Sequence, residues 1–149
     1  MLLKHKATQL ACGLFLWTGM AFAQANTDLE TAEKLFQSGK FAEAKAGYLQ
    51  VLKAEEKNFQ AHLRLGNIAL LSNQFSEADD WLAKAAALQP ENKSVKNLQG
   101  EAYYRRDNFA RAAAQFRDAG REPLARKLES FAEKIPYQIQ KKEFEVHAR

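Results

Sequence analysis

A short phrase, Phe-x-x-Ala, recurs in this chain with a spacing of 34 residues. It begins at Phe41, at Phe75 and at Phe109. Another column with the same step stands just ahead of the phrase and holds Gly39, Asn73 and Asp107. Asn73-Gln74 is expected to break the chain, because asparagine tolerates left-handed backbone geometry. A fixed period of this length is the signature of repeat architectures, in which each unit buries its apolar face only by stacking on its neighbours.

The clearest unit covers residues 59–92. Phe75, Ala78 and Leu82 recur there at the spacing of one helix face, which predicts a helix. Pro90 then closes the unit, because proline cannot continue a helix. Ahead of the turn, Leu65-Gly66 places a small residue where a paired helix can approach closely.

Together, the Leu-Gly pair, the aromatic residue after the turn, the small alanines and the closing proline resemble the tetratricopeptide repeat. That resemblance implies an all-α solenoid of helix–turn–helix units. Three such units are expected, over residues 24–58, 59–92 and 93–121. The first has Glu56 where the family usually has proline, as terminal repeats are often atypical.

A further helix is predicted after the repeats, over residues 122–135. Gly120 suits a helix stop and Pro123 suits the first turn of a new helix. We interpret this helix as a cap that shields the last repeat. Pro136 is expected to end it, and residues 136–149 are predicted to form an extended tail because Tyr137 and the residues after it alternate apolar with polar.

The stretch from Arg121 to Ile139 has a second resemblance. It looks like the linker of some exported bacterial proteins in which tetratricopeptide repeats precede a retropepsin-like aspartic protease domain. The chain itself contains no Asp-Thr-Gly or Asp-Ser-Gly motif. No protease activity is therefore implied, and a stand-alone or shortened relative of the repeat half is the alternative.

The N-terminus, residues 1–23, has the pattern of a secretory signal peptide. A basic start precedes a short apolar run, and Ala21-Phe-Ala23 provides a cleavage site before Gln24. The alternative is an uncleaved anchor, but the apolar run is shorter than the roughly 20 residues that a spanning helix needs. The mature chain is thus expected to be periplasmic or secreted and bacterial, with no stable membrane insertion.

Charge is distributed unevenly along the mature chain. Acids outnumber bases up to Asn92, and bases dominate from Lys93 onward. The later bases include Lys93, Lys96, Arg105, Arg106, Arg111, Arg117, Arg121, Arg126 and Lys127. Such a skew usually reflects solvated helix faces, and the alternative is a basic surface in the third repeat for an anionic polymer or lipid headgroups.

Catalytic constellations are not evident in the sequence. The mature chain has two histidines, and His62 has no acidic or histidine partner one helical turn later. Cys12 is predicted to leave with the signal, so the mature chain has no thiol nucleophile and no disulfide. The sequence therefore predicts a protein that is not an enzyme, without cofactor or metal and without a nucleic-acid partner.

In a tetratricopeptide array, the resemblance implies that the first helix of each repeat lines a concave groove that holds a peptide or helix. Phe36, Leu70 and Tyr104 share one column and would form an apolar stripe there, or else pack between helices. The full predicted groove is Leu29, Glu33, Phe36, Leu63, Arg64, Asn67, Leu70, Leu71, Asn97, Glu101, Tyr104 and Arg105.

One binding mode of the family is disfavoured. Repeat domains that grip acidic tails of heat-shock chaperones use a clamp of cationic and amide side chains, whereas the matching positions here are Leu29 and Glu33. The leading hypothesis is a non-catalytic scaffold or adaptor of the cell envelope that binds a protein partner in the groove. The alternatives are the accessory domain of a protease-type protein and the anionic-partner surface.

Overall fold

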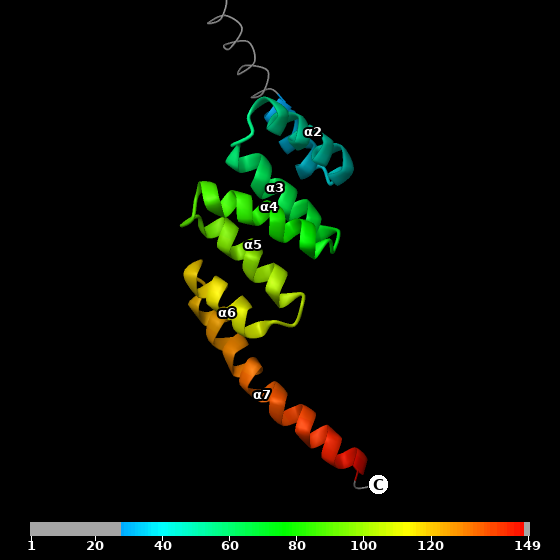
Figure 1. The fold of residues 1–149 in the computed structure, drawn as a ribbon, viewed down its shortest axis with the longest axis vertical. Helices are drawn as coiled ribbons and strands as arrows, with labels where there is room; N and C mark the ends of the chain where they lie inside the picture. The colour runs from blue at the N-terminus through cyan, green and yellow to red at the C-terminus, as the bar shows by residue number, and fades with distance from the viewer. Residues whose placement is uncertain (1–27, 148–149) are drawn as a thin grey trace, which may run out of the picture. The chain divides into compact units, whose positions relative to one another are not determined.

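A computed structural model describes residues 28–147 of the chain, in which helices and turns follow one another without a strand (Figure 1). The predicted signal peptide and its cleavage site lie outside these residues. A helical segment over 28–37 is followed by α2 (Phe41–Ala54), α3 (Phe59–Leu71), α4 (Phe75–Leu88), α5 (Lys93–Tyr104), α6 (Phe109–Asp118) and α7 (Glu122–His147). The prediction of an all-α repeat fold is confirmed.

The turn column explains how each hairpin reverses direction. Gly39 has a φ of 77°, and Asn73 and Asp107 each have a φ of 56°, all in the left-handed region. The residue after each one donates its N–H to a carbonyl five positions back, as in Gln74 N to Ala69 O at 2.8 Å. This pairing satisfies carbonyls that the end of the first helix leaves without a partner, and glycine, asparagine and aspartate adopt it at low cost.

The same device ends α6. Gly120 has a φ of 82°, and Arg121 N donates to Phe116 O at 2.7 Å. Pro123 then lies in the first turn of α7, as predicted, where its missing N–H costs nothing.

The chain divides into two units, one up to Ile68 and one from Ala69 onward. In the first unit, the helical segment 28–37 approaches α2 closely at Ala32. A Cβ added to Gly47 would lie 2.9 Å from Ala32 Cβ and 3.4 Å from Ala32 Cα. The buried apolar side chains of this unit are Ala32, Ala44, Tyr48, Val51, Ala61, Leu63, Leu65 and Ile68.

In the second unit, α6 packs against both α5 and α7. One core cluster joins α6 to α7 and consists of Ala112, Ala113, Phe116, Ala125 and Leu128. Gly100 of α5 lies under the Phe116 ring, where an added Cβ would be 2.9 Å from two ring atoms. The glycine thus lets the aromatic ring fill the space between the two helices.

The prediction for the tail was wrong. α7 runs from Glu122 through Pro136 to His147, whereas the sequence predicted a helix end at Pro136 and an extended tail. Proline removes one hydrogen bond of the helix and crowds the carbonyl four residues back. The residues after it are rich in Gln, Lys and Glu, which have high helix propensity, and the helix continues past the proline without a break.

Candidate functional site

Six predicted groove residues lie in the first unit, and three of them meet there. Glu33 accepts two hydrogen bonds from the guanidinium of Arg64, at 2.9 Å from Nε and 2.5 Å from Nη2. Tyr48 Oη donates to the same carboxylate at 2.9 Å. The Arg64 guanidinium also lies over the Phe36 ring, 4.7 Å from its centroid. Leu63 is buried, and Leu29 and Asn67 are half-buried.

This cluster fixes the charge states of its members. Burial alone would raise the pKa of Glu33, but the hydrogen bonds from Arg64 and Tyr48 outweigh it and hold the pKa below its ordinary value. Burial and the neighbouring carboxylate raise the pKa of Tyr48 well above its ordinary value. Arg64 is therefore already neutralised, and the first unit offers no unpaired cation at this point to an anionic peptide.

The other six predicted groove residues lie in the second unit, and they do not share one environment. Leu70 is 1% exposed, so it belongs to the core, while Leu71 is 44% exposed. The expectation that Leu70 forms part of an open apolar stripe is therefore wrong, because packing covers it. Arg105 pairs with Glu101 at 2.7 Å and donates to Leu70 O at 3.1 Å. Asn97 is half-buried.

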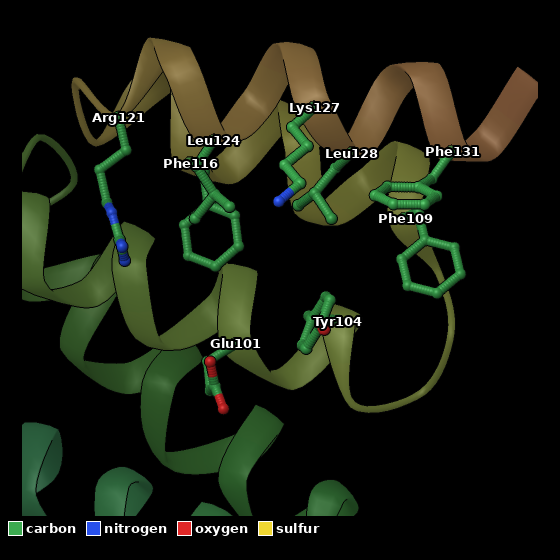
Figure 2. Close-up of a pocket in the computed structure, with 9 residues that line it drawn as sticks. All are labelled: Glu101, Tyr104, Phe109, Phe116, Arg121, Leu124, Lys127, Leu128 and Phe131. Atoms are coloured by element: carbon green, nitrogen blue, oxygen red, sulfur yellow. The ribbon is translucent and has the colours of Figure 1, made fainter.

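A cavity of about 420 Å³ opens in the second unit between α5, α6 and α7 (Figure 2). Only two predicted groove residues, Glu101 and Tyr104, contribute to its wall. Helices α6 and α7 supply the other lining residues, which are Phe109, Phe116, Arg121, Leu124, Lys127, Leu128 and Phe131.

One end of the cavity is aromatic. Tyr104 and Phe109 pack edge to face with ring centroids 5.8 Å apart. Phe131 lies on the same side, across from them on α7 (Figure 2). Tyr104 is 47% exposed and Phe131 is 50% exposed. Two large aromatic side chains thus stand half in water at the rim of an apolar cavity, an arrangement typical of binding sites.

The other end is cationic. Arg121 lies there, with its guanidinium 5.1 Å from the centroid of the Phe116 ring, and the Lys127 amine points into the cavity (Figure 2). Among residues 28–134, whose side chains the structure describes, neither Arg121 nor Lys127 has a carboxylate within ion-pair distance. Glu101, the acid in the cavity wall, is held by Arg105.

Most of the other bases in the basic half are already paired. Arg106 pairs with Asp79 at 2.8 Å and Lys96 with Glu91 at 3.2 Å. Arg117 lies against Glu129 and Glu122, and Arg126 pairs with Glu122 at 3.0 Å. The skew in the sequence therefore does not produce a uniformly basic face, and Arg121 and Lys127 are the bases that line the cavity.

Seven of the nine cavity residues were missed by the sequence analysis, although one signal was available. Phe131 follows Asn97 by 34 residues, in the column that begins with Leu29 and Leu63. Extending the repeat register into the capping helix would have placed Phe131 in the groove. Arg121 and Lys127 carry no such signal in the sequence, because their role depends on whether a carboxylate from another part of the fold lies beside them.

The described residues show little that suggests chemistry of another kind. Among the side chains of residues 28–134, no group of three or more His, Cys, Asp or Glu could hold a metal ion. His62 is buried, with Nε2 2.8 Å from Glu56 O. In the same range, no helix has both the length and the apolar character needed to cross a bilayer.

Comparison with known proteins agrees with the repeat seen in the structure. The family model described as tetratricopeptide repeat matches residues 35–102. The chain has the tetratricopeptide repeat fold. No match was found among curated proteins.

Solved structures with this repeat fold superimpose well on the chain at low sequence identity. The tetratricopeptide repeat domain of Arabidopsis OM64 is 21% identical over 74% of this chain and 94% of its own, with a TM-score of 0.64. The first such domain of Spaghetti (RPAP3), bound to an HSP90 peptide, is 19% identical over 75% and 93%, with a TM-score of 0.64. The Yersinia enterocolitica secretion chaperone SycD, in complex with a peptide of the translocator YopD, is 16% identical over 76% and 92%, with a TM-score of 0.61.

Proposed function

We propose that this protein is a non-catalytic interaction module that binds a peptide segment of a partner protein, and that the cavity between α5, α6 and α7 is its principal binding site. The observation that carries the proposal is the open cavity with Tyr104 and Phe131 half-exposed at its rim. Binding of an apolar anchor there removes both rings from water. Two proteins of the same fold were solved with peptides bound, which supports this class of function.

We further propose that the module works in the cell envelope, as a periplasmic or secreted protein. The support is the signal-peptide pattern of residues 1–23. Mass spectrometry of a periplasmic extract should find a chain that begins at Gln24. A membrane-bound form that still carries Met1 would contradict export with cleavage.

A selection of random capped peptides against the purified protein tests the proposed function. Peptides selected on the wild type should bind Tyr104→Ala and Phe131→Ala at least tenfold more weakly, since a buried aromatic anchor contributes roughly 2 kcal/mol or more. Leu49→Ala is the matched control, because it removes an exposed apolar side chain, 37% exposed on α2, that is not part of the cavity.

Two results would count against the module. If no peptide is enriched, the protein is not a peptide receptor of this kind. If Leu49→Ala weakens binding as much as the two aromatic variants, the cavity is not the site. Circular dichroism of each variant should show wild-type helicity, because all three side chains are on the surface.

Binding of an anionic polymer or a lipid surface is a weaker second hypothesis for the function. It requires an extended field of unpaired bases, whereas Arg106, Lys96, Arg117 and Arg126 are engaged by carboxylates. The stretch that resembles a protease linker lies mostly in α7, and its resemblance stays a prediction.

A further inference from the structure

We propose that the cavity selects peptides in which an acidic residue and an aromatic or leucine residue lie two positions apart in an extended segment. This inference rests on the proposed function and specifies its ligand. The apolar side chain enters the aromatic end, between Tyr104, Phe109 and Phe131. The carboxylate lies against Lys127, and Arg121 adds positive charge elsewhere in the cavity wall.

The charge distribution decides the sign of the ligand. Lys127 and Arg121 are the cations of the lining, and neither has a carboxylate partner among the described side chains of residues 28–134. Glu101 is neutralised by Arg105 at 2.7 Å. A basic or neutral peptide would leave two cations beside the cavity without a counter-charge, while an acidic side chain forms a charge-assisted hydrogen bond with Lys127.

The spacing follows from α7. Lys127 and Phe131 are four residues apart on this helix, which corresponds to about 6 Å along its axis. In an extended peptide, alternate side chains point the same way and lie about 6.6 Å apart. One peptide face can therefore present an acid to Lys127 and an apolar group to the ring of Phe131 at the same time.

In this proposal the carboxylate belongs to an aspartate or glutamate side chain within the bound segment. The spacing requires the acid and the apolar side chain to alternate along an extended chain, and a side-chain carboxylate meets this requirement in either chain direction.

Fluorescence polarisation with labelled eight-residue peptides, acetylated and amidated at their ends, tests this assignment. One peptide carries Glu-x-Phe and one carries Phe-x-Glu in a glycine and serine background. Matched peptides replace the glutamate by glutamine or by lysine, or the phenylalanine by alanine. At least one acidic order should bind, and the exchange of glutamate for lysine should weaken it about tenfold or more, as for a charged hydrogen bond lost.

Charge reversal in the protein provides the decisive comparison. Lys127→Glu should weaken the glutamate peptide and strengthen the lysine peptide, so that the preference inverts. Arg126→Glu is the control on the same helix: it makes the same charge change at a residue outside the cavity lining, and the preference should stay. Both residues are on the surface, so the fold should tolerate each change.

The outcomes separate this inference from the proposed function. If glutamate, glutamine and lysine peptides bind equally well and all lose affinity in Phe131→Ala, the peptide module stands and the acidic preference is wrong. If Arg126→Glu inverts the preference as Lys127→Glu does, the effect is one of net charge and the assignment to the cavity is wrong. If none of these peptides binds while the random selection enriches others through Tyr104, the spacing is wrong.

Discussion

The close contact between Gly47 and Ala32 predicts that Gly47→Ala destabilises the protein, whereas this exchange usually stabilises a helix. Replacing glycine by alanine inside a helix normally stabilises it by about 1 kcal/mol, because the backbone loses less freedom on folding. At Gly47 the new Cβ would lie 2.9 Å from Ala32 Cβ and 3.4 Å from Ala32 Cα. Carbon atoms pack at about 3.5–4.0 Å, so the helical segment 28–37 must move away from α2 by several tenths of an ångström or more.

The atoms that the new Cβ would meet include the Ala32 backbone, so rotation of a side chain cannot relieve the clash. Overpacking of this kind costs roughly 1–3 kcal/mol, and a rigid neighbour places the cost in the upper part of that range. Subtracting the gain in helix propensity, Gly47→Ala should lower the free energy of unfolding by about 1–2 kcal/mol. For a domain of this size, the melting temperature should fall by roughly 4–10 °C.

Thermal unfolding followed by circular dichroism measures this change. Ala46→Gly, at the exposed neighbouring position in α2, is the control, because it reports the alanine–glycine propensity difference in this helix without a packing contact. It should lower the free energy of unfolding by about 1 kcal/mol. If Gly47→Ala melts at or above the wild-type temperature while Ala46→Gly melts below it, the close approach of the two helices is refuted.

Three further predictions concern the core, the ionic cluster and the cavity. Ala78→Arg should abolish cooperative melting, because Ala78 is fully buried and the change places a charge in the core. A near-wild-type transition would show that the repeat register is wrong. Glu33 has a folded-state pKa below the ordinary 4.5, so its ion pair with Arg64 stabilises the fold above that pH, and this stability is lost as pH falls through the folded-state pKa. Glu33→Gln should therefore lower the free energy of unfolding by about 1–3 kcal/mol near neutral pH. In a series of denaturation curves at falling pH, the variant should lose less stability at acid pH than the wild type. An equal loss in both proteins would mean that the ion pair contributes nothing to stability. Gly100→Ala should push the Phe116 ring towards the cavity, because two ring atoms would be 2.9 Å from the new Cβ. The free energy of peptide binding should therefore fall more than the free energy of unfolding. Unchanged peptide affinity would show that the Phe116 ring is not part of the binding site.

The local sequence was sufficient for the helical hairpins. A turn could be assigned at Asn73 from its residue type, and the structure places it and its repeat equivalents, Gly39 and Asp107, at positive φ. The reason is that these turns depend on the backbone preference of one residue and on carbonyls a few positions away. Helical periodicity and the repeat step likewise need no knowledge of distant contacts.

The surface, in contrast, depends on which neighbours each side chain meets. Phe36, Leu70 and Tyr104 occupy one column of the repeat, yet Leu70 is in the core and Tyr104 is 47% exposed. Pro136 is a strong local signal for a helix end, but α7 continues past it. The position of a residue in the repeat predicts where its backbone lies, but it does not predict which side chains pack against it.

The sequence by itself determined the all-α repeat architecture and the turns that build it, because these rest on short-range backbone preferences and on a period that every unit repeats. Only the tertiary structure decided where the cavity lies and which charges remain available in it. Arg64 and Lys127 are both cations in the sequence, but Arg64 folds against Glu33, whereas Lys127 points into the cavity without a carboxylate partner among the side chains described, those of residues 28–134. That difference arises from side chains brought together across helices, and a one-dimensional pattern does not contain it.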